Sequence, residues 1–183
     1  ISALIRLKDH DGALRMLLGL GDLMRAAVEQ PKHHLVPLSE ELAFVKRYVD
    51  LQQVRFADRL QVSYDVDEGC TSLDVPAFML QPLVENALRH GAAPRPGLCH
   101  VRIGARAEHD HLRLWVTDDG VGLPRGFDLE RDAGTGLSNT RSRLAQLYGS
   151  AATLDVRAAV RTGTTVEIRV PSPASSRRIV GAA

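Results

Sequence analysis

Three short stretches combine charged or amide side chains with glycines in a way that a packed core does not need. The first is Gln81-Pro82-Leu83-Val84-Glu85-Asn86-Ala87-Leu88-Arg89-His90. Its polar residues lie three and four positions apart, so in a helix they share one face: Glu85, Asn86, Arg89 and His90. This face suits a magnesium-bound triphosphate, because Asn can ligate the metal and Arg can pair with phosphate. An ordinary solvated helix face is the alternative interpretation.

The second stretch is Val116-Thr117-Asp118-Asp119-Gly120-Val121-Gly122-Leu123. A strand pattern runs directly into two acids and two glycines. A carboxylate fixed at a strand end, such as Asp118, can accept a hydrogen bond from an exocyclic amine like that of adenine. Gly120 and Gly122 would let the backbone approach a flat ligand closely. Taken alone, the stretch is also compatible with a simple Asp-Gly turn.

The third stretch is Gly134-Thr135-Gly136-Leu137-Ser138-Asn139-Thr140-Arg141-Ser142-Arg143. Paired glycines open a predicted helix here, so free backbone N–H groups and the helix dipole offer an anion site. No Gly-Lys-Ser/Thr follows, which excludes a Walker P-loop. The spacing also fails the dinucleotide-binding fingerprint. A tight turn before a helix is the alternative.

The elements around these stretches can be predicted from apolar periodicity. Residues 1–30 predict a helical hairpin with a polar turn at 8–12, and its strong apolar face needs a partner. Residues 31–37 are expected to be a linker, since Pro31 cannot continue the helix. A long helix is expected from about Ser39, which can cap it, with Glu40 and Glu41 favoured by the dipole of the first turn.

Beyond residue 59, strands and helices are interspersed. Alternating apolar and polar residues predict strands at 60–66, 101–107, 112–117, 152–156 and 164–170. Helical periodicity predicts helices at 76–90 and 137–148. The second and third strands adjoin and are expected to be antiparallel. The predicted fold class is α+β: a two-layer sandwich of a mixed sheet with helices on one face. The Ser/Ala-rich tail at 172–183 is expected to be disordered.

Composition narrows the function classes. The 183 residues include 23 Lys and Arg against 22 Asp and Glu, a net charge of +1 that gives no electrostatic reason to expect nucleic-acid binding. No apolar run approaches the ~18–20 residues of a membrane span. Cys70 and Cys99 lack metal-site spacing, so a reducing compartment is expected. Because Ile1 lies within an apolar helical pattern, the chain is expected to be part of a longer protein.

In this order, with a strand pair between the first and second, the three stretches resemble the Bergerat-fold ATPases, the superfamily of DNA gyrase, MutL and the histidine kinases. Glu85-Asn86 resembles the N box, Asp118-x-Gly120-x-Gly122 the G1 box and Gly134-x-Gly136-Leu137 the G2 box, while Gly163-Thr164 opens the last element. More narrowly, residues 37–42, 55–60, 80–87 and 136–144 resemble the C-terminal part of LytS-type sensor histidine kinases. The resemblance covers about residues 34–171 well and the hairpin more loosely.

The resemblance implies a partial dimerisation hairpin at 1–30, a linker at 31–37 and an ATP-binding catalytic domain at 38–171. It implies ATP and Mg²⁺ as cofactors, with Asn86 as the metal ligand and a lid at 123–133. Glu85, Asn86 and Arg89 would be the catalytic residues at the phosphates. The residues implied to bind the nucleotide are Asn86, Arg89, His90, Asp118, Gly120, Gly122, Gly134, Thr135, Gly136, Leu137 and Thr164.

The implied reaction passes the γ-phosphoryl group to a histidine and then to an Asp of a response regulator with a DNA-binding output domain. The parent protein would be a homodimer through the N-terminal helices. This chain would be its cytoplasmic part, without a membrane segment or direct nucleic-acid contact, and the parent itself would be membrane-bound. Alternatives are a nucleotide-binding module that gates a protein contact, and a Ser/Thr protein kinase of the anti-sigma type.

Two positions depart from the family pattern. Pro82 stands where Bergerat ATPases that hydrolyse ATP carry a Glu, so transfer to another acceptor is favoured over hydrolysis. No Asn-Pro-His-Phe stretch with the acceptor histidine is present, and His10, His33 and His34 are not expected to replace it. We therefore expect the chain to bind Mg-ATP without phosphorylating itself stably.

Overall fold

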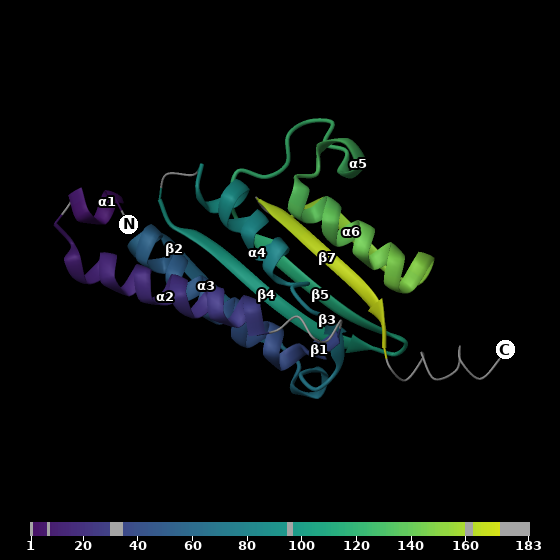
Figure 1. Ribbon diagram of the computed structural model, residues 1–183. Helices are drawn as coiled ribbons and strands as arrows, with labels where there is room; N and C mark the ends of the chain where they lie inside the picture. Colours follow the sequence, from purple (N-terminus) through teal and green to yellow (C-terminus); the bar gives the residue numbers. More distant parts are fainter. Residues whose placement is uncertain (1, 7, 30–34, 95–96, 160–162, 173–183) are drawn as a thin grey trace.

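The computed structural model describes residues 2–6, 8–29, 35–94, 97–159 and 163–172. Two long antiparallel helices lie beside a sheet, and further helices cover one face of this sheet, which is its inner face (Figure 1). The α+β fold class is therefore confirmed. Residues 31–34 of the linker predicted at 31–37, and residues 173–183 of the predicted disordered tail, lie outside the described residues.

The main sheet has five strands in the order β2-β4-β5-β7-β6. Only β2 and β4 run parallel, and the other neighbours are antiparallel, as was predicted for β4 and β5. The register places Val101 beside Asp118, so the end of β5 lies next to the start of β4. The strands are β2 Leu60–Val66, β4 Cys99–Glu108, β5 His111–Asp118, β6 Thr153–Ala158 and β7 Thr164–Pro171.

Three helices precede the main sheet: α1 Ser2–Arg6, α2 His10–Glu29 and α3 Leu38–Phe56. The predicted turn at 8–12 is wrong in its extent, because Asp9 caps α2 by accepting the N–H of Gly12 at 2.8 Å, so the helix resumes at His10. The long helix begins at Leu38, so Ser39 lies inside its first turn. The helix α2 packs against α3, with Gly19 of α2 close to Leu51 of α3.

A second, two-stranded sheet corrects two predictions. β1, Leu35–Pro37, pairs antiparallel with β3, Asp74–Pro76, through the buried pair Val36 and Val75. The end of the predicted linker is therefore a strand. The helix predicted at 76–90 begins later, because Pro76 belongs to β3 and Phe78 has a left-handed φ of 57°, which no α-helix accommodates.

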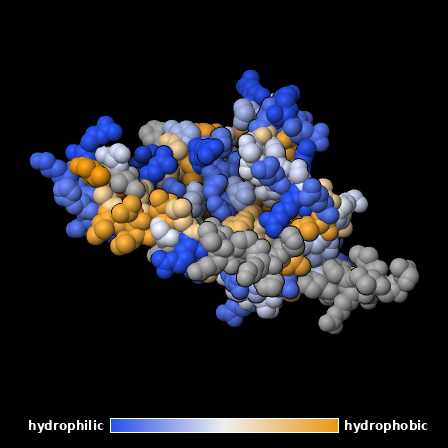
Figure 2. Space-filling model, viewed as in Figure 1, coloured by the Kyte–Doolittle hydropathy of each residue, from blue (hydrophilic) through white to orange (hydrophobic). Residues whose placement is uncertain are grey.

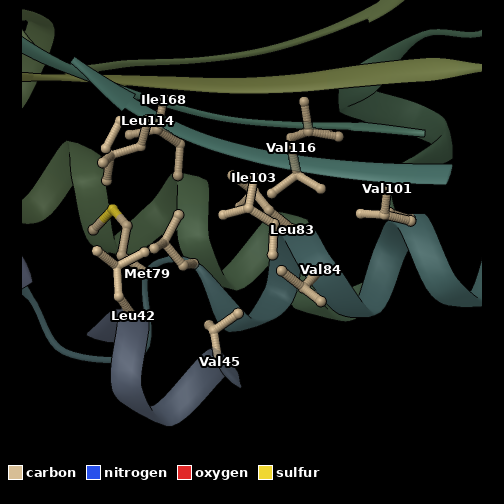
Figure 3. Packing of buried hydrophobic residues seen from close by; sticks show 14 of the residues in the cluster. Leu42, Val45, Met79, Leu83, Val84, Val101, Ile103, Leu114, Val116 and Ile168 are labelled. Carbon is tan, nitrogen blue, oxygen red and sulfur yellow. The ribbon is translucent and has the colours of Figure 1, made fainter. Parts of the chain in front are cut away.

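The helix that carries the first polar stretch is α4, Gln81–Asn86, and it continues as a π-helix, η3, Ala87–Ala92. With α6, Thr135–Tyr148, it covers the inner face of the sheet. Figure 3 shows Leu83 and Val84 of α4 between the sheet residues and Val45 of α3. The remaining short elements are η1 Ala57–Arg59, η2 Glu68–Cys70, α5 Leu129–Asp132 and η4 Gly149–Ala151.

The outer face of the sheet has a polar layer of its own. Glu167 is only 1% exposed and accepts hydrogen bonds from Arg113 on β5, Arg157 on β6 and Arg169 on its own strand, β7. Burial alone would raise the pKa of Glu167, but the three guanidinium groups outweigh it and lower that pKa. A buried carboxylate thus holds β5, β6 and β7 together on the face opposite α4 and α6.

Candidate functional site

One cavity of about 560 Å³ lies among the elements that carry the three polar stretches. Its walls come from α4 with η3, from the loop after β5, from the start of α6 and from the ends of β6 and β7. Six of the predicted nucleotide-binding residues line it: Asn86, His90, Gly122, Gly134, Leu137 and Thr164. Apolar side chains of the loop, including Leu123 and Phe127, complete the wall. The cavity joins polar groups at one end to an apolar surface that suits a flat ring.

Asp118 lies behind this cavity, among several glycines. A Cβ atom added to Gly91 would come within 2.5 Å of the Asp118 carboxyl carbon, and one on Gly120 within 2.3 Å of Gly91 Cα. Gly163, with a φ of 90°, would place a Cβ 2.0 Å from the Asp118 carbonyl oxygen. The end of β5, the π-helix and the start of β7 therefore approach one another as closely as backbone allows.

The Asp118 carboxylate is 3% exposed and accepts the N–H of Gly120 at 2.9 Å. Burial raises its pKa, while main-chain hydrogen bonds from Gly120 and Thr164 act in the opposite direction and the charge of Asp119 adds to the rise. Asp118 does not itself line the 560 Å³ cavity, but it accepts a main-chain hydrogen bond from Thr164, which does. It also borders a hollow of about 710 Å³ on the outer face of the sheet.

The start of α6 forms the opposite wall. Gly134 is its N-cap in an extended conformation and has no capping side chain, so the first backbone N–H groups have no partner within the helix. Gly134 and Leu137 line the cavity, whereas Thr135 and Gly136 adjoin it. Gly136 faces Pro82 of α4, where an added Cβ would lie 3.7 Å from Pro82 Cβ. The two helices thus meet directly beside the start of α6.

The structure does not keep the four polar residues of the first stretch on one face. Asn86 and His90 line the cavity, whereas Glu85 and Arg89 line a separate hollow of about 390 Å³ against α3. That hollow also contains Tyr48 and Gln52. The prediction of one shared face is wrong because consecutive helical residues point about 100° apart, so the four residues form two neighbouring rows. Each row faces a different hollow.

The loop between β5 and α6, where a lid was predicted at 123–133, forms part of the cavity wall. It is organised locally: Asp128 caps α5 by accepting the N–H groups of Glu130 and Arg131, and Arg131 pairs with Asp132 at 2.8 Å. An exposed ion pair of Glu130 with Arg141, at 3.3 Å, joins the lid to α6. Exposed pairs of this kind contribute little to stability.

Among the described residues, no group of three or more His, Cys, Asp or Glu could hold a metal ion. The side-chain oxygens that line the cavity include the amide of Asn86 and the carboxylate of Asp132, and Asp132 is paired with Arg131. Such a sparse set fits Mg²⁺, which keeps several waters and is commonly held by one or two protein ligands plus substrate phosphates. Cys70 and Cys99 are both buried, and burial raises the Cys99 pKa to about 12, as expected for cysteines that pack.

Sequence comparison assigns the two halves of the chain separately. Residues 1–60 match the family described as "Histidine kinase". Residues 74–174 match the family described as "Histidine kinase-, DNA gyrase B-, and HSP90-like ATPase". The second match contains the whole cavity, while the first contains the N-terminal helices and α3.

Curated relatives and solved structures agree with these families. The chain is 35% identical over 180 residues to the sensor protein LytS of Enterococcus faecalis and 32% identical to LytS of Bacillus subtilis, covering 93% of this chain and 30% of each relative. It thus spans about 30% of their length. The histidine kinase domain of the blue-light activated kinase EL346 from Erythrobacter litoralis has a similar fold, with a TM-score of 0.61, 22% identity and coverage of 92% and 78% of the two chains.

Proposed function

Since the chain belongs to the histidine kinase-, DNA gyrase B- and HSP90-like ATPase family and is similar to LytS-type sensor histidine kinases, we propose that its cavity binds Mg-ATP for phosphoryl transfer to a histidine. The observation that carries the proposal is the joint wall of the cavity. Asn86, Gly122, Gly134 and Thr164 come from four separate parts of the chain and line one space.

We assign the adenine to the end of the cavity beside Asp118. The carboxylate would accept a hydrogen bond from the exocyclic amine, and Thr164 would lie beside it. Gly122 lines the cavity, and Gly120 lets the loop approach the backbone of Gly91 closely. The apolar lid residues would exclude water from the ring face.

The phosphates would lie between the start of α6 and the π-helix. Backbone N–H groups from Gly134 to Leu137 would hold their oxygens, and His90 would face them from the other wall. Asn86 would hold Mg²⁺, which neutralises charge on the phosphates during transfer. Pro82 cannot activate water, so the chain favours transfer over hydrolysis.

Glu85 and Arg89 would act on the acceptor side. They line the hollow against α3, across the helix from the cavity, and Glu85 accepts a hydrogen bond from Gln81 at 2.7 Å. In that place Glu85 could orient an incoming imidazole while Arg89 pairs with the transferred phosphoryl group. The acceptor histidine would belong to the parent protein, which would pass the group to an Asp of a response regulator.

The parent would be a homodimer through the N-terminal helices. Figure 2 shows hydrophobic side chains gathered over α2. They are exposed in this chain, with Leu18 at 61% and Met24 at 63%, together with Leu14, Leu17 and Leu20. An apolar stripe of this size is typical of an interface in a helical bundle. No helix in the described part of the chain is long and apolar enough to cross a membrane.

Calorimetric titration of the chain with ATP, with and without Mg²⁺, tests the nucleotide site. We expect Asn86→Ala to abolish the gain in affinity that Mg²⁺ gives and to leave metal-free ATP binding nearly unchanged. Asn139→Ala, on the exposed face of α6, is the matched control. Equal Mg²⁺ dependence in the wild-type chain and Asn86→Ala would contradict the metal assignment and favour a module that senses only the nucleotide.

Sedimentation analysis tests the dimer. Leu18→Glu should convert a dimeric chain to a monomer, because it places a charge in the apolar stripe. Leu147→Glu, at an exposed leucine of α6, should leave the oligomeric state unchanged. A monomeric wild-type chain would refute an interface built from these residues alone.

A further inference from the structure

A second buried carboxylate lies outside the cavity, and the nucleotide-binding motifs do not include it. Glu41, in the first turn of α3, is 1% exposed. Its two oxygens accept three main-chain N–H groups: those of Phe78 at 2.5 Å, Met79 at 2.8 Å and Leu80 at 3.1 Å. Burial raises its pKa, against the effect of these hydrogen bonds and of Arg143. From the sequence, Glu41 was expected only to interact favourably with the helix dipole.

The three amides belong to the segment that starts α4. Leu80 is the N-cap of α4 and makes no side-chain cap of its own, and Glu41, 39 residues away, accepts the N–H of Leu80 itself. A carboxylate here also faces the positive end of the helix dipole. These contacts offset part of the desolvation of the charge, and they fix where α4 begins.

Arg143 of α6 binds the same segment from the other side. Its guanidinium donates to the carbonyl oxygen of Ala77, one residue before the amides that Glu41 binds. Phe78, between the two contacts, has a φ of 57°. A left-handed backbone at a bulky residue is strained and persists only where its surroundings hold it. Residues 77–80 are therefore held jointly by α3 and α6.

We propose that Glu41 and Arg143 are positioning residues that hold residues 77–80 and so set the distance between Asn86 on α4 and the N-terminus of α6. The proposal rests on the proposed function, because its consequence is a cavity of the right width for Mg-ATP. It also connects that cavity to α3, against which the hairpin helix α2 packs. A shift of α3 along its axis moves Glu41, and with it the start of α4.

Calorimetric titration with Mg-ATP at a temperature where each variant is fully folded tests the proposal. In Glu41→Gln one amide N–H₂ would face a backbone N–H, so we expect binding 3- to 10-fold weaker than wild type. Arg143→Met should have a similar effect, and Arg143→Lys should restore most of the affinity because an ammonium can still donate to Ala77. Glu40→Gln, an exposed neighbour in the same turn, is the matched control.

The double variant decides whether the two residues act together. If they hold one segment, Glu41→Gln combined with Arg143→Met should weaken Mg-ATP binding by less than the product of the two single effects. Variants that melt at lower temperature but bind Mg-ATP as the wild type does would show a purely structural role and overturn the inference. Should Glu41→Gln fail to fold, the two Arg143 variants test the same positioning role. A wild-type chain that binds no Mg-ATP contradicts the proposed function, and this inference with it.

Discussion

Replacing Asp118 by Asn separates nucleotide binding from stability more cleanly than any other change in this chain. The substitution keeps the shape of a side chain that is 3% exposed and removes only its charge. The remaining oxygen can still accept the N–H of Gly120, which turns the new N–H₂ group toward the adenine side. A donor would then face the exocyclic amine, also a donor. We therefore expect nucleotide binding to weaken.

The magnitude follows from the loss of one charge-assisted hydrogen bond in a buried site, about 1.5–3 kcal/mol, or about 10- to 150-fold in the dissociation constant. Stability should change in the opposite direction. Because burial raises the pKa of Asp118, the ionised carboxylate destabilises the folded chain at neutral pH, and protonation relieves this as pH falls through the raised pKa. Asp118→Asn should thus be at least as stable as the wild type at pH 7, with the difference shrinking in acid.

Titration with ATP and with inosine triphosphate provides the assay. The inosine base has a carbonyl oxygen in place of the amine, so the wild type should prefer ATP and Asp118→Asn should lose or reverse that preference. Asp119→Asn is the matched control, because Asp119 pairs with His100 at 3.0 Å on the outer face. If Asp118→Asn binds ATP within about twofold of the wild type, or if Asp119→Asn has the larger effect, the carboxylate that recognises the base has been misassigned.

Three further changes test the packing around the site. Gly163→Ala should lower the free energy of unfolding in urea by more than about 3 kcal/mol, because it combines a positive φ with a Cβ 2.0 Å from the Asp118 carbonyl oxygen. Its control is Gly97→Ala, at a φ of 102° with open space around it, which should lower the free energy of unfolding by only about 1–2 kcal/mol. Glu167→Gln should weaken the fall in the free energy of unfolding at acidic pH. Because the pKa of Glu167 is lowered in the folded chain, its carboxylate stabilises the fold at pH values above the ordinary pKa of Glu, and this stability is lost as the pH falls through the lowered pKa. Gly104→Ala should shift the fluorescence of the single tryptophan, because its Cβ would lie 2.0 Å from the indole ring, and an unchanged spectrum would contradict the packing of that face.

The strands and their order along the chain were predictable because their signal is local. Alternation of apolar and polar residues identified all five strands of the main sheet within a few residues. The three polar stretches were likewise visible as runs of adjacent residues. Their assembly around one cavity could be expected only from the resemblance to a known fold, because spacing along the sequence says little about which loops meet.

What the sequence did not show depends on long-range contacts. Glu41 looks like any acid in a first helical turn, and nothing local indicates that its partners are Phe78 to Leu80. The strand β1 has only three residues and forms because β3 offers it hydrogen bonds. The position of α3 decides which residues of the first polar stretch face the cavity. Because α3 packs beside Glu85 and Arg89, these two line the other hollow, and Asn86 and His90 line the cavity.

The Glu41 contact has a thermodynamic consequence for the hairpin. If displacement of α3 weakens Mg-ATP binding by about 3- to 10-fold, linkage requires Mg-ATP to favour the undisplaced α3 by the same factor, about 0.7–1.4 kcal/mol. Such a bias is too small to drive a rearrangement alone but is sufficient to shift a balanced equilibrium between two hairpin arrangements. The same contacts that position Asn86 would then let occupancy of the cavity be sensed at α2, because α2 packs on α3 and α3 reaches the start of α4 through Glu41.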